Sequence, residues 1–288
     1  MERLSVRRYE VPLYLGRRVL AFATLGVLAA WPAVAQEFNG FFPAKGQGDL
    51  ALSYTTESYD EFWVGTTKVS DPGVGETTTK SFALWLRYGL TDRLAVVANV
   101  PYVEATSDGL GGFEDSGLQD LSAVLTFKAL EGGSASRQRL VVGVGGRTEL
   151  SDYQANSPVS IGDSTTDVLF RAVYQFEHRG FYFSQQIGYD LRGGDAPNGI
   201  PLYTEVGNTW GRFTLNGFYL RYIARGGTDI GDPGFTFPSN QDETVRIGAK
   251  AFARVADSFG VFVGGFTTLD GRNSGDATGF SLGTTYRF

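Results

Sequence analysis

The chain of 288 residues contains no cysteine, a single histidine and a single methionine. Without cysteine it forms no disulfide and no thiolate metal site, and one histidine leaves little scope for imidazole-based catalysis or metal binding. The net charge is only −6 and no run of basic residues occurs, which argues against a nucleic-acid partner. No apolar run reaches the roughly 20 residues that a mature transmembrane helix needs. Glycine (39 residues) and aromatic residues (14%) are abundant instead, and this composition favours a β-rich protein.

The first 35 residues have the pattern of an export signal. An apolar stretch from Val19 to Ala30 is followed by the small residues Ala33-Val34-Ala35, which are typical of a cleavage site. The basic region before that stretch contains Arg3, Arg7, Arg8, Arg17 and Arg18. We therefore predict a signal peptide over residues 1–35 and one mature domain over residues 36–288. An uncleaved signal anchor is the alternative, and the shortness of the apolar stretch argues against it.

The last eleven residues alternate in character, as the residues of an extended strand do. One face carries Phe280, Leu282, Thr284, Tyr286 and Phe288, and the other carries Ser281, Gly283, Thr285 and Arg287. This segment resembles the closing strand of bacterial outer-membrane β-barrels, in which an aromatic terminus belongs to the insertion signal.

Strand-like runs of this kind recur from Gly48 to the end of the chain, and we count about twelve. They lie near residues 49–57, 81–90, 93–105, 117–130, 139–150, 166–177, 181–192, 202–210, 213–225, 244–255, 259–269 and 278–288. Very short turns alternate with long, polar, glycine-rich loops, which matches the periplasmic turns and extracellular loops of outer-membrane barrels. The sequence therefore predicts an all-β fold, a transmembrane antiparallel up-and-down β-barrel of about twelve strands in the bacterial outer membrane.

The charged residues of each run share one face. In residues 166–177, Val168 and Phe170 alternate with Asp167 and Arg171. An Arg or Lys on the lipid-facing side at the bilayer midplane costs about 2–4 kcal/mol. We therefore expect the apolar face to meet lipid and the charged face to line the lumen.

The charged face supplies the candidate functional residues. The predicted lumen-lining residues are Arg87, Asp120, Arg147, Glu149, Asp167, Arg171, Arg192, Glu205, Arg221, Arg246, Lys250 and Arg254. They either select solutes by charge and width or form a structural network of ion pairs that fills the barrel. Long inward Arg side chains narrow the lumen of a barrel of this size, so we expect a conductance below that of a general porin.

Two stretches resemble a known family. They are residues 86–94 (Leu-Arg-Tyr-Gly-Leu-Thr-Asp-Arg-Leu) with 99–102 (Asn-Val-Pro-Tyr), and residues 117–121 (Gly-Leu-Gln-Asp-Leu) leading into a strand. The pattern is similar to the outer-membrane family labelled "MetA-pathway of phenol degradation", which is grouped with transporters of apolar compounds. The resemblance implies an outer-membrane location and uptake of aromatic or other hydrophobic compounds, and it supplies no assigned binding residue.

The function that these features favour is an outer-membrane channel or transporter for small molecules, with hydrophobic or aromatic solutes implied by the resemblance. A structural or adhesive barrel without transport is the alternative. An enzyme is disfavoured, because the only histidine, His178, falls in a predicted periplasmic turn, far from where a barrel active site would lie. We predict no cofactor and no metal site, since Asp229, Asp232 and Asp242 lack the spacing of a calcium loop.

The loops suggest partners as well as a solute. We expect contacts with membrane lipid and, through divalent cations, between lipopolysaccharide and the loop acids Asp108, Glu114, Asp115, Asp152, Asp163, Asp195 and Asp276. Apolar loop residues either capture a solute or pack on the barrel rim; they are Phe62, Trp63, Leu110, Phe113, Ile200, Phe235 and Phe237. Only Gln36 to Gln47 precede the first strand, which does not predict a substantial plug like that of long-chain fatty-acid channels.

Overall fold

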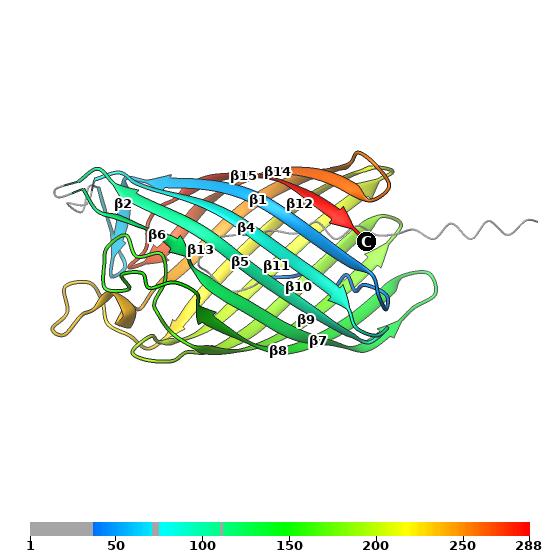
Figure 1. Cartoon of the computed structure of the whole chain (residues 1–288), viewed down its shortest axis with the longest axis horizontal. Helices are drawn as coiled ribbons and strands as arrows, with labels where there is room; N and C mark the ends of the chain where they lie inside the picture. Colours follow the sequence, from blue (N-terminus) through cyan, green and yellow to red (C-terminus); the bar gives the residue numbers. More distant parts are fainter. Residues whose placement is uncertain (1–36, 71–74, 110–111) are drawn as a thin grey trace, which may run out of the picture.

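The computed structural model describes residues 37–70, 75–109 and 112–288; the predicted signal peptide and cleavage site, together with Leu110, lie outside these residues. The described residues form a closed antiparallel barrel of twelve wall strands, which confirms the predicted fold class (Figure 1). In ring order the wall consists of β1 (Gly48–Tyr59), β4 (Thr77–Gly89), β5 (Leu94–Ser107), β6 (Glu114–Leu118) with β7 (Asp120–Gly132), β8 (Arg137–Glu149), β9 (Asp167–His178), β10 (Phe181–Leu191), β11 (Asn198–Trp210), β12 (Phe213–Arg225), β13 (Glu243–Arg254), β14 (Phe259–Arg272) and β15 (Thr278–Arg287). Among the described residues no helix is long and apolar enough to cross a membrane.

One wall strand is interrupted. Both β6 and β7 pair with β5, and Gln119 between them donates its backbone N–H to the carbonyl of Pro101 at 2.9 Å. A proline has no N–H to give to a ladder, so it is tolerated where the pairing is already irregular. The predicted single run over residues 117–130 therefore appears as two strands that act as one.

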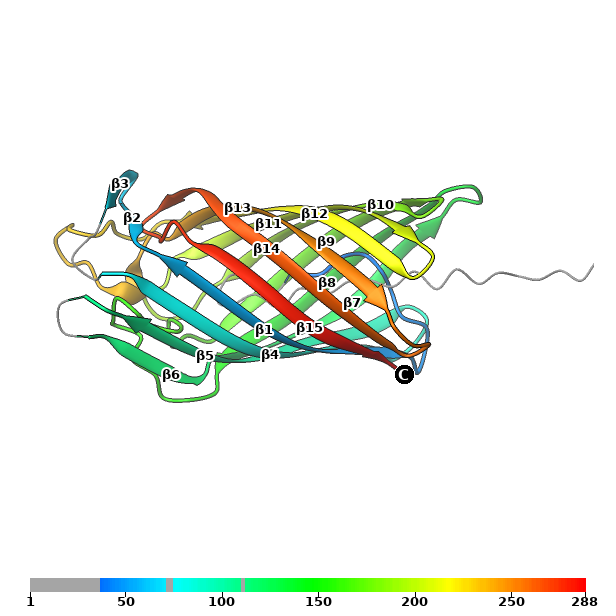
Figure 2. The same cartoon turned by 90° about the horizontal axis from the view of Figure 1, so that it is seen from above.

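The links differ at the two ends of the barrel, as predicted. One end, here called the short-turn end, has five turns at residues 90–93, 133–136, 179–180, 211–212 and 255–258. At the turn 179–180 both Arg179 (φ 48°) and Gly180 (φ 91°) have positive φ, the geometry that two-residue hairpins require. The opposite, long-loop end carries the long links, and the first of them contains a hairpin of β2 (Glu61–Val64) and β3 (Thr67–Ser70) (Figure 2).

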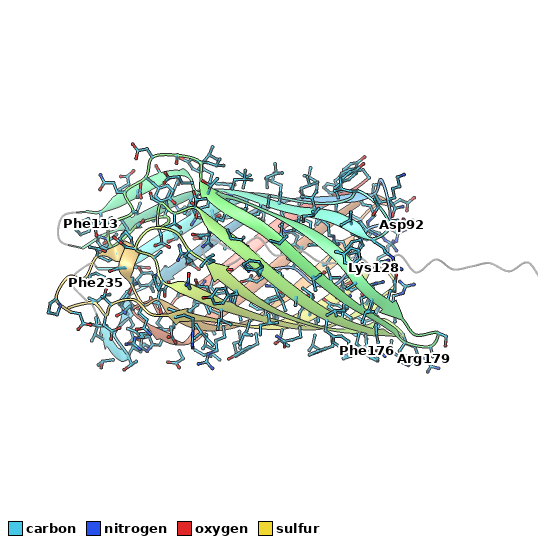
Figure 3. All side chains as sticks on the ribbon, turned by 90° about the horizontal axis from the view of Figure 1, so that it is seen from below. Asp92, Phe113, Lys128, Phe176, Arg179 and Phe235 are labelled. Carbon is cyan, nitrogen blue, oxygen red and sulfur yellow. The ribbon has the colours of Figure 1, made fainter. Side chains whose placement is uncertain are left out.

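The two faces of the wall have the predicted character. Val168, Phe170 and Tyr174 of β9 are exposed on the outside, whereas Asp167 and Arg171 are buried inside. Side chains project outward along the whole barrel, with Asp92 and Arg179 at the short-turn end and Phe113 and Phe235 at the long-loop end (Figure 3). An exposed apolar surface of this extent is what a lipid-facing wall needs and what a water-soluble barrel avoids.

The aromatic chain end closes the ring. Phe288 exchanges backbone hydrogen bonds with Gly48 at 2.9 and 3.0 Å, and its ring stacks on Tyr88 and Tyr286 at centroid distances of 6.1 and 6.2 Å. A Cβ on Gly48 would lie 2.5 Å from the Phe288 ring, so glycine makes room for this contact.

We predict that deleting Phe288 lowers the yield of folded barrel. The deletion removes the last two backbone hydrogen bonds between β15 and β1, at the seam where the first and last strands must meet. The measurement is the fraction of protein that migrates as the heat-modifiable folded form on electrophoresis. Leu130→Ala, which truncates an exposed residue near the same end of the barrel, serves as a control, and an equal folded fraction in both variants would contradict the prediction.

Candidate functional site

The segment before β1 turns back into the lumen from the short-turn end (Figure 2). We call residues 37–43 the plug; residues 37–41 are buried. The backbone N–H of Phe38 donates to Gln186 Oε1 at 3.0 Å, and that of Gly40 donates to Ser184 Oγ at 3.3 Å. Side chains of the inner wall thus satisfy backbone groups that would otherwise be buried without a partner.

Asn39 spans the lumen. Its amide Nδ2 donates to Glu205 Oε1 of β11 at 3.3 Å, and its Oδ1 accepts from Arg87 Nη1 of β4 at 3.4 Å. Since β4 and β11 lie six places apart in the ring of twelve strands, they stand on opposite walls. One plug side chain therefore connects opposite walls of the barrel.

An apolar contact anchors the plug. Phe38 is 4% exposed and packs in a cluster with inward residues of β1, β4, β5, β7, β8 and β9, namely Ala51, Trp85, Val97, Val124, Val141, Leu169 and Val173. Phe41 meets the ring of Tyr182 edge-on at 5.1 Å, and its carbonyl accepts a hydrogen bond from Arg87 Nη1 at 2.7 Å. The inner wall is therefore not uniformly polar: it carries an apolar belt at the level of the plug.

Gly40 fits where a larger residue would not. A Cβ at this position would lie 2.6 Å from Gln175 Cβ, a distance that real Cβ atoms essentially never show. The plug backbone can approach β9 this closely only because the side chain is absent.

The short N-terminal segment did not predict a substantial plug, yet residues 37–43 lie in the lumen. The physical reason is that six or seven residues are enough to cross a barrel of this diameter, whereas a wider barrel needs a whole domain. The available signal was the run Phe38-Asn39-Gly40-Phe41-Phe42, which is too apolar for a solvated leader and has no strand periodicity.

Ion pairs surround the plug at three levels. At the long-loop end Arg147 Nε donates to Asp167 at 2.8 Å and Arg192 Nη2 donates to Asp163 at 2.6 Å. Arg246 Nη1 lies 3.1 Å from Glu57 Oε2 at the same level.

In the middle of the barrel Arg171 Nη1 donates to Asp190 at 2.6 Å, and Lys250 Nζ lies 3.9 Å from Glu205 Oε2. Near the short-turn end Arg87 Nη2 donates to Asp49 at 2.9 Å. Buried charges are tolerable only when paired in this way.

Most of the predicted lumen residues face inward. Those on the inner side of the wall are Arg87, Asp120, Arg147, Asp167, Arg171, Arg192, Glu205, Arg246, Lys250 and Arg254. Glu149 has the inward parity of β8 but lies at its exposed end and contacts no basic group among the ion pairs of the described chain. Arg171 pairs with Asp190 on the neighbouring strand, whereas Arg246 pairs with Glu57 on a strand that is not its neighbour.

Arg221 is the exception, since it faces outward. It shares its parity with the exposed residues Leu215 and Tyr219 of β12 and is itself exposed. It lies toward the long-loop end of the strand, where a flexible Arg side chain can extend its head to the membrane surface while its stem covers apolar wall. Its expected place among the lumen residues is thus corrected to the outer face.

Above the plug is an outer cavity of about 240 Å³ at the long-loop end. The loop between β8 and β9 folds into the barrel to form one side of it, with Tyr153 and Ile161 packed against Val103 and Ala105. Arg147, Arg192 and Arg246 line the cavity together with acids, and Tyr59, Phe62 and Phe237 add aromatic surface. It is a mixed polar and aromatic chamber rather than an open pore.

Below the plug is an inner cavity of about 200 Å³ at the short-turn end. The plug residues Phe41 and Phe42 form one side, and Arg87, Arg139 and Arg287 form another. The inner and outer cavities share no lining residue. The plug therefore stands between two chambers, one at each end of the barrel.

The loop carboxyl of Asp242 is perturbed. Burial raises the pKa of Asp242 to about 7; Asp163 adds to the rise, and Arg246 and Arg192 oppose it. Near neutral pH the carboxyl in the outer cavity is thus divided between its charged and neutral forms.

The remaining candidates have structural contacts. Trp63 is buried and its backbone N–H donates to the carbonyl of Ser274, whereas Phe235 meets Phe237 of its own loop edge-on at 5.3 Å. His178 lies at the short-turn end, where its Nδ1 is 3.0 Å from Ser136 Oγ, and joins two turns.

The comparisons with known proteins concern the fold. No family model matches the chain and no curated protein matches it. The chain is similar to the crystal structure of an outer membrane channel from Pseudomonas putida F1, with a TM-score of 0.70 and 16% identity over 89% of this chain and 100% of that chain.

Two autotransporter barrels are similar at a lower level. The translocator domain of NalP from Neisseria meningitidis has a TM-score of 0.50 and 10% identity over 85% of this chain and 90% of that chain. The β domain of the Bordetella autotransporter Brka has a TM-score of 0.50 and 12% identity over 85% and 100%. At these identities the likeness establishes a shared barrel architecture.

Proposed function

We propose that this protein is an outer-membrane channel whose lumen is closed by its own plug and opens for small molecules when the plug is displaced. The observation that carries the proposal is the bridge that Asn39 makes between opposite walls, with a separate cavity on either side of the plug. A barrel whose only task was structural would need no pair of chambers on its axis.

The plug is attached in a way that allows release. It forms no strand pairing with the wall: its backbone bonds go to wall side chains, and its apolar anchors are the rings of Phe38, Phe41 and Phe42. A two-state plug that is mostly docked can be shifted by a solute that binds better to the open state.

The outer face supports the membrane location. Its apolar residues are exposed around the ring, and the fold is that of outer-membrane barrels. With the short turns in the periplasm, β1 begins and the chain ends at Phe288 on the periplasmic side.

This orientation gives a prediction about surface access. An epitope tag in residues 226–242 should be reachable on intact cells, and a tag in the turn beside His178 should be reachable only after the outer membrane is permeabilised. Antibody labelling of intact and permeabilised cells measures both. Labelling beside His178 on intact cells would reverse the topology.

The solute class is the second part of the proposal. Aromatic residues around the outer cavity favour solutes with a flat apolar face, which includes the hydrophobic or aromatic compounds that the resemblance implies. Because both cavities are small, the solutes are small as well.

The alternative is a structural barrel without transport, and the many ion pairs inside the barrel favour it.

Swelling of liposomes that contain the purified protein distinguishes the plugged channel from the structural barrel. Slow uptake of small solutes that stops with increasing solute size supports a plugged channel, and no uptake of any solute by the wild type or by a plug-deleted variant would favour the structural barrel.

A further inference from the structure

One stretch of chain beside the outer cavity carries four unsatisfied polar atoms. Within the described residues, Asn240 Oδ1, Asp242 Oδ1, Thr244 Oγ1 and Arg246 Nε are each buried without a hydrogen-bond partner. All four residues line the outer cavity. Thr244 and Arg246 belong to the start of β13, and Asn240 and Asp242 lie in the segment that leads into it.

Four buried polar atoms without partners lower the stability of the fold unless a bound molecule supplies their hydrogen bonds. A buried polar atom left unpaired costs roughly 1–3 kcal/mol, and native proteins keep few of them. Here four such residues lie within a seven-residue segment, at the end of a loop and the start of β13, and all of them line one cavity. We call residues 240, 242, 244 and 246 the polar ladder.

The chemistry of the ladder limits what it can bind. Asn240 Oδ1 is fixed as an acceptor because its Nδ2 donates to the carbonyl of Asn273 at 3.1 Å. The carboxyl oxygen of Asp242 accepts when ionised, the hydroxyl of Thr244 both donates and accepts, and Nε of Arg246 donates. A matching solute offers several donors and at least one acceptor along one edge, which hydroxyl groups do.

The surrounding charges do not select a charged solute. Arg192 is paired with Asp163, and Arg246 is paired with Glu57 through a different nitrogen, so a carboxylate balances the positive charge of each guanidinium while Arg246 Nε keeps one N–H to donate. Asp242 would repel an anion, and the nearby Arg192 and Arg246 would repel a cation. The cavity therefore suits a neutral molecule.

Aromatic rings complete the cavity. Tyr59 and Phe62 lie at a centroid distance of 5.9 Å, and both line the cavity with Phe237. Pockets of this kind combine flat apolar walls with a few fixed polar groups that orient the ligand. A purely apolar solute would fit the rings but would leave the ladder unpaired.

We propose that the outer cavity binds a neutral solute with several hydroxyl groups, such as a small sugar, whose hydroxyls pair with the polar ladder and whose apolar face lies against Tyr59, Phe62 or Phe237. This site deepens the proposed function by naming its solute class. Binding itself requires only the outer cavity and does not depend on passage past the plug.

Calorimetric titration of the purified full-length mature protein tests the site, in a detergent without a sugar headgroup that could compete. The probes are glucose, maltose, arginine and phenol. Glucose or maltose should bind saturably, with the other two weaker. Thr244→Val keeps the side-chain shape but removes the hydroxyl, and it should weaken sugar binding by roughly three- to tenfold.

Two further variants make the result specific. Asp242→Asn keeps an acceptor but removes the charge, so sugar binding should persist within about threefold, whereas binding of a cation would be lost. Thr267→Val alters an exposed threonine whose hydroxyl meets Thr278 Oγ1 outside the cavity, and it should leave binding unchanged.

Several outcomes would overturn the proposal. Binding of arginine that Asp242→Asn abolishes would make the cavity a cation site, and binding of phenol alone would make it an apolar site. No binding of any probe would mean that water alone meets the ladder. Because titration needs no transport, sugar binding without liposome swelling would contradict the proposed channel and leave this site standing.

Discussion

Deleting residues 37–42 should turn a nearly silent barrel into one that conducts steadily in planar bilayers. The deletion removes the Asn39 bridge between β4 and β11 and the Phe38 ring from the apolar belt. The wall itself stays hydrogen-bonded from strand to strand, because the plug contributes no strand pairing. The measurement is single-channel recording of the purified variant beside the wild type, with a rise in conductance of several-fold or more expected.

A graded variant separates opening of the plug from damage to the barrel. Phe38→Ala removes a buried phenyl ring, a change that costs about 3–5 kcal/mol in protein cores. If that cost falls on plug docking, the ratio of open to closed plug rises by roughly a hundred- to several thousandfold, since each 1.4 kcal/mol is a factor of ten. Open events in Phe38→Ala should therefore be far more frequent than in the wild type.

The matched control is Lys45→Ala, which changes an exposed residue of the same segment outside the lumen. It should leave the conductance as in the wild type. Equal conductance in the deletion, in Phe38→Ala and in the wild type, with all three folded, would mean that the plug does not gate the barrel.

The barrel fold could be predicted from the sequence because the pattern that specifies each strand lies within that strand. A strand in a membrane wall must alternate between lipid and lumen, so Val168 and Phe170 on one face and Asp167 and Arg171 on the other already fix which way β9 faces. The alternation of turns and loops then orders the strands. Nothing in that argument needs contacts between distant residues.

Ion pairs within the lumen were harder to predict. Pairs between neighbouring strands follow from the strand register, whereas pairs between distant strands do not. Arg147 and Asp167 stand directly opposite each other on β8 and β9, so a hairpin register would have paired them. Arg246 meets Glu57 across a sequence separation of 189 residues, between strands that are not neighbours. Such a contact depends on barrel diameter and tilt, which no local pattern contains.

The plug and the polar ladder lay beyond the sequence for different reasons. The plug has no periodicity, and its place is set by complementarity to Arg87 and Glu205 on opposite walls. The ladder has strand periodicity, but only the closed structure reveals that Asp242 and Thr244 face a cavity without partners. The prediction that Arg221 faces the lumen was wrong for a simpler reason. It relied on the charge of Arg221, although the residues that share its face of β12 are apolar.

Asp190→Ala should destabilise the folded barrel strongly, by about 3–5 kcal/mol. The side chains of Arg171 and Asp190 are 0% exposed and lie 2.6 Å apart, and removing the carboxylate leaves the guanidinium charged in a site without water. The measurement is the urea midpoint of unfolding in detergent, or the temperature at which the heat-modifiable form is lost.

A double variant tells charge burial from loss of packing. Arg171→Met with Asp190→Leu replaces the pair by apolar groups of similar volume, and it should recover most of the stability because no unpaired charge remains. Asp276→Ala breaks the exposed loop pair with Lys68 and should cost less than about 1 kcal/mol, since surface ion pairs contribute little. If Asp190→Ala were as mild as Asp276→Ala, water would have to reach Arg171, and the lumen at that level would be open rather than filled. Equal and large losses in the single and double variants would instead assign the effect to the shape of the inner wall.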